Sequence, residues 1–238
     1  MEIEGIVIRN SQYRDHDSMV SILAKDRIYS VLARGVNKID SKNAHRVSLF
    51  VRANYSILKT QEGYSLKNGS VINGYERIKS SFEGLVSLDF ISEITNKMIT
   101  NCDTESLYDS LTSILDLLNE GYDALTLLNI YLAKVLRVAG FGLNVDSCQN
   151  CGHVTSIVGI SYHNGGFICA DCFDKNNHKK CSARKLKIFR YLFKAEPKDY
   201  NKVVLEKDEA KEILLELIEF TQNIAQLDFK SVELIKNL

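Results

Sequence analysis

The stretches Cys148-Gln-Asn-Cys151 and Cys169-Ala-Asp-Cys172 are separated by seventeen residues. Two residues between paired cysteines let both thiolates of a tight turn face one ion, and a loop of about fifteen to twenty residues brings a second such turn round to complete a tetrahedron. The pattern therefore predicts one structural Zn²⁺ held by four thiolates, since a catalytic zinc would keep an open position for water. Two disulfides or unrelated buried thiols are the alternative interpretation.

The surroundings of the two pairs agree with a small metal-binding module. Gly159, Gly165 and Gly166, which lie between them, favour a short hairpin. His153 follows the first pair and is a substitute ligand, although four cysteines already fill a tetrahedron. The remaining cysteines, Cys102 and Cys181, are predicted to be ordinary free thiols.

The composition is that of an ordinary globular protein, because 45% of the 238 residues are hydrophobic. No stretch approaches the roughly eighteen apolar residues that a membrane span needs. The acidic start, Met1-Glu-Ile-Glu4, does not resemble a leader peptide. We therefore expect a cytoplasmic protein with reduced thiols and no membrane partner.

A formal net charge of zero conceals an alternation of charge along the chain. Lys and Arg are in excess in residues 1–80 and 141–200, whereas Asp and Glu are in excess in residues 81–140 and 201–238. Segregated basic segments can form a face that binds polyanions on a neutral protein. Chance clustering is the alternative.

The first eighty residues have the pattern of β-strands. Short apolar runs alternate with polar breaks and predict strands around Ile3–Val7 and over Met19–Leu23, Ile28–Val36, Val47–Leu58 and Tyr64–Val71. Five short strands in about eighty residues are typical of a small closed barrel, and such barrels commonly offer one face and its loops to single-stranded nucleic acid.

The period of the apolar residues then becomes helical. Apolar positions recurring at three and four predict helices over residues 85–98, 107–118, 125–139, 182–194 and 208–227. The fold class is therefore α+β with several domains. The predicted domains are a small β-barrel in residues 1–79, a helical domain in residues 80–145 and 177–238, and a zinc-binding module inserted into the helical domain at residues 146–176.

Two basic segments are candidates for contacts with phosphate. In the barrel, a loop with Asp40 as its only acid carries a first group of predicted DNA-binding residues, Arg34, Lys38, Lys42, Arg46 and Arg52. A second basic block follows the cysteines, and its predicted DNA-binding residues are Lys179, Lys180, Arg184, Lys187 and Arg190. For both segments the alternative is a solvated surface that binds no phosphate. For the second segment the sequence favours this alternative about as much as contact with phosphate.

Four tyrosines, Tyr13, Tyr29, Tyr55 and Tyr64, lie within or beside the predicted strands. A ring that faces outward can stack on a base. Taken singly, each ring is better explained as part of the barrel core or its edge.

No catalytic motif is present. The chain lacks a Walker loop, G-x-S-x-G, H-E-x-x-H and the H-x-E with P-C-x-x-C of zinc deaminases. The five histidines are scattered. We therefore predict no catalytic residues and no enzymatic activity.

Over nearly its whole length the chain resembles the RecO family of bacterial DNA-repair recombination mediators. The resemblance begins with Gly5-Ile-Val-Ile-Arg-Asn10 and continues in Val31-Leu-Ala-Arg-Gly35 before the basic loop. Its most specific part is Leu136-Arg-Val-Ala-Gly-Phe-Gly-Leu-Asn144, which leads into the first cysteine pair. The proline that the family often has at this junction is absent.

This resemblance implies an OB-fold followed by a helical domain with a zinc finger. It implies binding of single- and double-stranded DNA and annealing of complementary strands. It also implies that the protein acts with RecR to help RecA load on strands covered by single-strand-binding protein. The implied location is the cytoplasm, in association with the nucleoid. Two other classes remain open: an OB-fold and zinc-knuckle accessory protein that binds RNA, and a non-catalytic adaptor whose basic segments bind an acidic protein tail.

Overall fold

The computed structural model describes residues 1–99, 103–202 and 205–238, so the predicted free thiol Cys102 lies outside the described residues. The chain divides into two compact units. Met1–Asn96 together with Cys102–Gly121 form the first, which we name the barrel unit. Lys97–Asn101 together with Tyr122–Leu238 form the second, which we name the cysteine unit.

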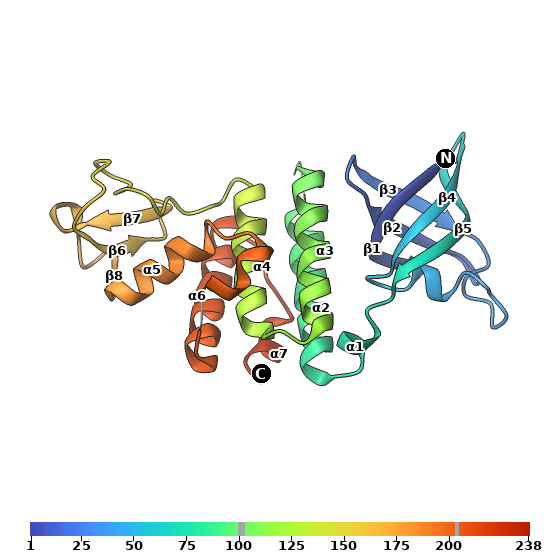
Figure 1. The fold of residues 1–238 in the computed structure, drawn as a ribbon. Helices are drawn as coiled ribbons and strands as arrows, with labels where there is room; N and C mark the ends of the chain where they lie inside the picture. The colour runs from blue at the N-terminus through green and yellow to red at the C-terminus, as the bar shows by residue number, and fades with distance from the viewer. Residues whose placement is uncertain (100–102, 203–204) are drawn as a thin grey trace. The chain divides into compact units, whose positions relative to one another are not determined.

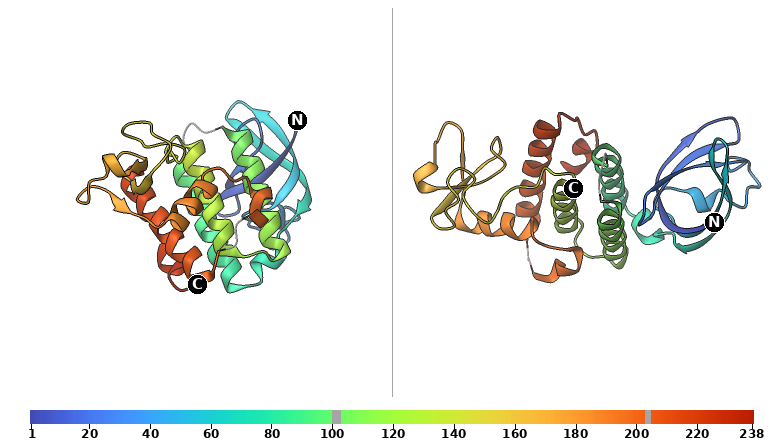
Figure 2. Two further views of the ribbon diagram at one scale, coloured as in Figure 1. Left: turned by 60° about the vertical axis from the view of Figure 1, so that its left-hand side comes forward. Right: turned by 90° about the horizontal axis from the view of Figure 1, so that it is seen from above.

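Five strands close a barrel in the order β1-β2-β3-β5-β4, with β4 pairing back on β1 (Figures 1 and 2). All neighbouring strands are antiparallel except β3 and β5, which are parallel. The strands are β1 Glu2–Gln12, β2 Ser18–Leu23, β3 Ile28–Ala33, β4 Arg52–Thr60 and β5 Gly63–Asn73. The predicted OB-fold barrel is therefore confirmed.

Alternating apolar residues build the interior of this barrel, as the period of two along a strand requires. Val20, Ile22, Val31 and Ala53 have no exposed surface. Gly5 lets β1 approach β2 closely, because a Cβ at that position would lie 2.4 Å from Cγ2 of Ile22. Apolar side chains thus fill the barrel, and at Gly5 the strands approach so closely that only glycine fits.

The fourth strand begins later than the apolar pattern indicates. Residues His45–Val47 form a 3₁₀ turn, and Phe50 has a positive φ of 62°. Val47 and Val51 nevertheless belong to the buried core of the barrel, so part of the apolar run that predicted a strand from Val47 covers the barrel interior. The strand itself starts at Arg52.

Three helices belong to the barrel unit: α1 Glu76–Lys79, α2 Phe82–Met98 and α3 Thr104–Glu120. Asn96 of α2 donates from Nδ2 to the carbonyl of Ile8 at 2.8 Å, which joins this helix to β1. Gly121 ends α3 with a φ of 95°, a left-handed conformation that favours glycine.

The cysteine unit contains a three-stranded sheet and four helices among its described residues. The strands are β6 Ile157–Ser161, β7 Gly166–Cys169 and β8 Lys179–Lys180, in the order β7-β6-β8. The helices are α4 Ala124–Val138, α5 Ala183–Leu192, α6 Lys207–Ala225 and α7 Val232–Ile235. The five helices predicted from the sequence correspond in chain order to α2, α3, α4, α5 and α6.

Helix α4 is the centre of this unit, since nearly all of its residues are buried. Asn129 of α4 donates from Nδ2 to the carbonyls of Leu125 at 2.9 Å and of Ala210 at 2.8 Å, and the second bond joins α4 to α6. Lys134 of α4 is buried and lies 2.9 Å from the carboxylate of Glu196. Within the described part of the chain, no helix has both the length and the apolar content to cross a membrane.

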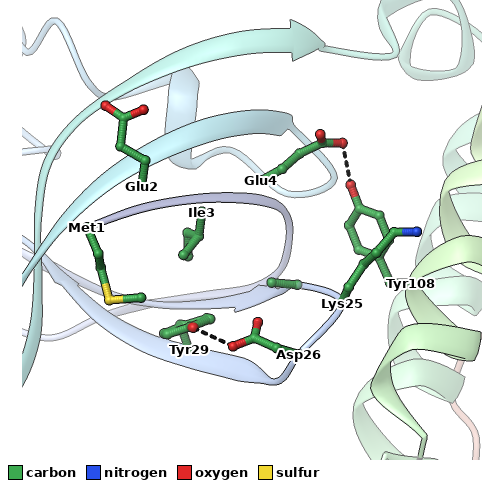
Figure 3. A pocket seen from close by; sticks show the side chains of 9 residues that line it. Met1, Glu2, Ile3, Glu4, Lys25, Asp26, Tyr29 and Tyr108 are labelled. Atoms are coloured by element: carbon green, nitrogen blue, oxygen red, sulfur yellow. Dashed lines mark hydrogen bonds between the residues drawn. The ribbon is translucent and has the colours of Figure 1, made fainter.

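A polar cluster on the outside of the barrel joins β1, β4 and α3. Glu4 of β1 accepts a hydrogen bond from the hydroxyl of Tyr108 at 2.7 Å (Figure 3). Arg52 of β4 donates to the same carboxylate at 2.6 Å. The hydrogen bond from Tyr108, and next to it the one from Arg52, lower the pKa of Glu4 below its ordinary value. The folded state therefore favours the ionised carboxylate.

We predict that Glu4→Gln lowers the free energy of unfolding at pH 7 by less than about 1 kcal/mol, because the pair is half exposed and screened by solvent. A carboxylate whose pKa is lowered by folding stabilises the protein above its unfolded pKa, and this contribution is lost as the pH falls through the folded pKa. Urea unfolding between about pH 7 and pH 3 measures both effects.

Glu2→Gln is the matched control, since Glu2 lies two residues earlier on the same strand, is exposed and forms no ion pair within the described ranges. The control is expected to keep the stability and pH dependence of the wild type. Equal behaviour of the two variants would show that the cluster around Glu4 does not contribute to stability.

Candidate metal centre and nucleic-acid surface

The four paired cysteines come together in the cysteine unit. The Sγ atoms of Cys148, Cys151, Cys169 and Cys172 all lie within 4.8 Å of one another, and those of Cys151 and Cys169 are 3.6 Å apart. Cys148 and Cys169 are buried, whereas Cys151 is exposed. The predicted pairing of the two C-x-x-C turns around one point is therefore confirmed.

The first turn is held by its own backbone. The amide of Cys148 donates to the carbonyl of His153 at 2.7 Å, and the amide of Gly152 donates to the carbonyl of Cys148 at 2.8 Å. Gly152 has a φ of 78°, so a side chain at this position would be strained. The second turn begins where β7 ends at Cys169 and continues as a 3₁₀ turn over Ala170–Cys172.

The donor set fits a tetrahedral metal ion. Zinc–sulfur bonds of about 2.3 Å place neighbouring sulfurs of a tetrahedron about 3.8 Å apart, which matches the observed spacing. Disulfide sulfurs would be only about 2.05 Å apart, and all five described cysteines are free. Although burial acts in the opposite direction, backbone amides lower the pKa of the Cys148 thiol, whereas the hydrogen bond to Cys151 and burial raise the pKa of Cys172. Neighbouring thiols without a cation between them thus oppose one another's ionisation, and a bound cation would favour the four thiolates.

A second group of possible ligands overlaps this cluster. One ligand atom each of His153, Cys169 and Asp171 lie within 4.8 Å of one another. Because Cys169 belongs to both groups, His153 lies beside the four-cysteine cluster, and its role as a substitute ligand stays a prediction. The four sulfurs alone complete the coordination of one ion.

The barrel loop presents its cations without acidic partners. Arg34, Lys38 and Lys42 are exposed and form no ion pair within the part of the chain that the structure describes. Arg46 is half-buried and donates to the amide oxygens of Asn43 at 2.5 Å and Asn68 at 2.7 Å. These four predicted residues therefore lie on one connection of the barrel, and no carboxylate of the described residues neutralises their charges.

Arg52 differs from the other four. Its guanidinium is 2.6 Å from Glu4 and 3.8 Å from Asp116, so it belongs to the polar cluster that joins the barrel to α3. The prediction of Arg52 as a DNA contact stays untested, but a structural role already accounts for this residue.

Most cations of the second basic block have acidic partners within the cysteine unit. Arg184 forms two bonds to Glu209 at 2.6 and 2.7 Å, and Arg190 lies 2.8 Å from Asp146. Lys179 lies 2.9 Å from Glu216 of α6. Sequence inspection missed these partners because Arg184 and Glu209 are twenty-five residues apart. The carboxylates reduce the positive charge that this block offers to a polyanion.

Lys180 and Lys187 remain exposed and form no ion pair among the described residues. Lys187 lies on α5, whose opposite face buries Leu186 and Phe189. The helix is therefore anchored by its apolar side, as predicted, but only part of its charge is available.

Glu216 is a residue that the sequence did not single out. Its buried carboxylate accepts from the hydroxyl of Tyr162 and pairs with Lys179 and with Lys185, the latter at 2.5 Å. Against the effect of burial, the hydrogen bonds from Lys185, Tyr162 and Lys179 lower the pKa of Glu216. This cluster joins the sheet β7-β6-β8, which together with the four cysteines we call the cysteine module, to α5 and α6.

Three of the four barrel tyrosines are structural. Tyr55 is fully buried, and Tyr29 packs edge-on against Tyr64 with ring centroids 5.2 Å apart. Tyr13 is half exposed, and the guanidinium of Arg14 lies 5.1 Å from its ring centroid. Only Tyr13 among these four offers an outward ring.

A cavity of about 370 Å³ lies in the barrel unit beside the start of β1 (Figure 3). Most of its polar side chains are engaged: Glu4 accepts from Tyr108, Tyr29 donates to Asp26 at 2.7 Å, and Lys25 pairs with Asp109 at 2.8 Å. The exposed Glu2 also lines the cavity. This cavity therefore resembles a structural junction more than a catalytic pocket, because most of its acids and bases already have partners.

The fold and these two sites define a class: a multi-domain OB-fold protein with a cationic barrel loop and a four-thiol metal module. The family description "Recombination protein O N terminal" matches residues 1–75, and "Recombination protein O C terminal" matches residues 80–233. The chain belongs to the RecO family. Membership of this family gives it a role in DNA repair.

Relatives from several bacteria agree with this assignment. A protein named DNA repair protein RecO from Listeria innocua is 30% identical over 178 residues, which cover 74% of this chain and 70% of the relative. The proteins of the same name from Bacillus pumilus and Halalkalibacterium halodurans are 28% and 25% identical and cover 79% and 80% of this chain. These matches cover 76% of each of the two relatives.

We predict that the purified protein contains about one zinc ion per chain. Cys148→Ser or Cys172→Ser should release the ion and lower the free energy of unfolding of the cysteine unit by at least about 3 kcal/mol, since binding of a structural metal is coupled to folding. Metal analysis and thermal unfolding with and without a chelator measure these effects.

Cys181→Ser is the control, because Cys181 is a free thiol outside the cluster. It should keep the metal and the stability of the wild type. A metal-free protein that stays folded with four titratable thiols in the cluster would contradict the prediction.

Proposed function

We propose that this protein is a non-catalytic recombination mediator that binds single- and double-stranded DNA and anneals complementary strands. We further propose that, together with RecR, it helps RecA load on DNA covered by single-strand-binding protein. The cytoplasm, in association with the nucleoid, is the proposed location. One structural Zn²⁺ on the four cysteines is the proposed cofactor.

The observation that supports DNA binding is the group of unpaired cations on the loop between β3 and β4. Arg34, Lys38 and Lys42 are exposed at one connection of an OB-fold barrel. Cations that lack internal carboxylate partners can replace the counterions of a phosphate backbone, and the release of those counterions drives binding. OB-fold barrels bind single strands through such grooves and loops.

Annealing needs two strands to approach each other despite their charge. A surface that neutralises several phosphates lowers this repulsion and raises the local concentration of both strands. Lys180 and Lys187 of the cysteine unit are the predicted contacts that remain free to take part, whereas Lys179, Arg184 and Arg190 would first have to leave their carboxylates.

The partners RecR, RecA and single-strand-binding protein are proposed from membership of the RecO family.

The proposed domain division is a barrel in residues 1–79, helices in residues 80–145 and 177–238, and a zinc finger in residues 146–176. Preferential binding of structured RNA would favour the RNA-binding accessory protein. Capture of an acidic protein tail would favour the non-catalytic adaptor.

We predict that replacing Arg34, Lys38 and Lys42 together by Gln weakens binding of a single-stranded oligonucleotide about tenfold or more at about 0.1 M salt. The slope of log affinity against log salt should fall by about 2, since each lost phosphate contact removes about 0.7 on a single strand. Fluorescence anisotropy at several salt concentrations measures both quantities.

The triple variant Lys59→Gln, Lys198→Gln and Lys207→Gln is the matched control, because it removes the same charge from exposed lysines outside the loop. It should bind as the wild type does. An unchanged salt slope in the loop variant would count against the loop as a phosphate site. Annealing of complementary oligonucleotides, bare or covered with single-strand-binding protein, then tests the proposed activity.

A further inference from the structure

The side chain of Ile39 is a fully exposed apolar group on the cationic loop. Its relative exposure is 108%, whereas Val154, another exposed apolar residue, reaches 70%. Single apolar residues on a surface are common and carry no meaning alone. The argument for Ile39 therefore rests on its place in the loop and on what surrounds it.

The loop is built as a series of turns that project from the barrel between β3 and β4 (Figure 1). Gly35 has a φ of 66°, and the amide of Lys38 donates to the carbonyl of Gly35 at 3.3 Å. The amide of Ser41 then donates to the carbonyl of Lys38 at 3.1 Å. Ile39 lies inside this second turn, and its side chain is fully exposed there.

The loop is also tied to the connection between β1 and β2. The amide of Gly35 donates to the carboxylate of Asp17 at 2.8 Å, and the amide of Asn37 donates to the carbonyl of His16 at 3.0 Å. That connection carries Tyr13, whose ring is half exposed and accompanied by the guanidinium of Arg14. Two apolar groups, one aliphatic and one aromatic, thus lie on two tethered connections of the same barrel.

Cations flank Ile39 on both sides in sequence. Lys38 precedes it directly and Lys42 follows three residues later, and neither forms an ion pair within the described ranges. A polyanion held by these lysines would bring its bases within reach of the only large aliphatic side chain of residues 37–44. Proteins that unstack bases use apolar wedges such as Ile, Leu or Phe for this purpose.

We propose that Ile39 enters between adjacent bases of single-stranded DNA while the lysines beside it hold the phosphates. Burial of the side chain against base faces removes apolar surface from water, which favours the inserted state. Bases separated in this way are exposed for pairing with a second strand. This inference rests on the proposed DNA-binding function and assigns a base contact to one residue.

The test uses a single-stranded oligonucleotide that contains 2-aminopurine, whose fluorescence rises when it is unstacked. The wild type should raise the fluorescence on binding. Ile39→Ala should bind about fivefold more weakly and lose most of the fluorescence rise, whereas its salt slope should stay unchanged because no phosphate contact is lost. Ile39→Phe should keep the rise, since a larger apolar group can also insert.

Leu85→Ala is the matched control, because it removes the same number of carbons from a half-exposed side chain on α2 of the barrel unit. It should behave as the wild type. Equal affinity and fluorescence for wild type and Ile39→Ala would overturn the proposal while leaving DNA binding intact, and so would a loss of affinity accompanied by a lower salt slope. If the wild type binds no single strand, both this proposal and the proposed function fail.

Discussion

The pairing of β1 with β4 is the constraint on which the barrel unit depends. By joining the first strand to the fourth, it converts five short strands into a closed surface without free edges. Within this closed sheet, the antiparallel pairing of β2 with β3 places Ser18 opposite Ala33, so the residues before β2 and those after β3 lie at the same end, where the amides of Gly35 and Asn37 bond to Asp17 and His16. The cationic loop is therefore supported by the barrel and is not an independent coil.

The cysteine module has a different physical basis. Its core is small: among the described residues, the cluster of buried side chains at the cysteines consists of Cys148, Ile168 and Cys169, with Ile157, Cys172 and Phe173 packed against it. Three short strands cannot bury enough apolar area to fix their own arrangement, and coordination of one ion by four sulfurs supplies the missing order. The buried carboxylate of Glu216, shared by lysines and a tyrosine, then links this module to the helices that follow.

The sequence alone was sufficient for features that depend on local spacing. The five barrel strands follow from a period of two residues, the five long helices from a period of three to four residues, and the four-sulfur cluster from the two C-x-x-C turns. Features that depend on tertiary contacts were out of reach, because Arg184 meets Glu209 and Arg52 meets Glu4 only after the chain has folded. Short elements such as α1 and α7 have too few residues for a period to be visible. The assignment of Arg34, Lys38 and Lys42 to DNA binding remains a prediction, now supported by their lack of carboxylate partners.

The ion pairs of α5 have a thermodynamic consequence. The carboxylates beside Arg184 and Arg190 are covalently part of the chain, so they act as counterions that cannot diffuse away. A nucleic acid that displaced them would exchange one bound anion for another and would free fewer salt ions into solution. The entropy gained by dilution of released ions, which makes binding sensitive to salt, would then come mainly from the barrel loop. Ionic strength would thus act on this protein as a selective probe of one of its two basic surfaces.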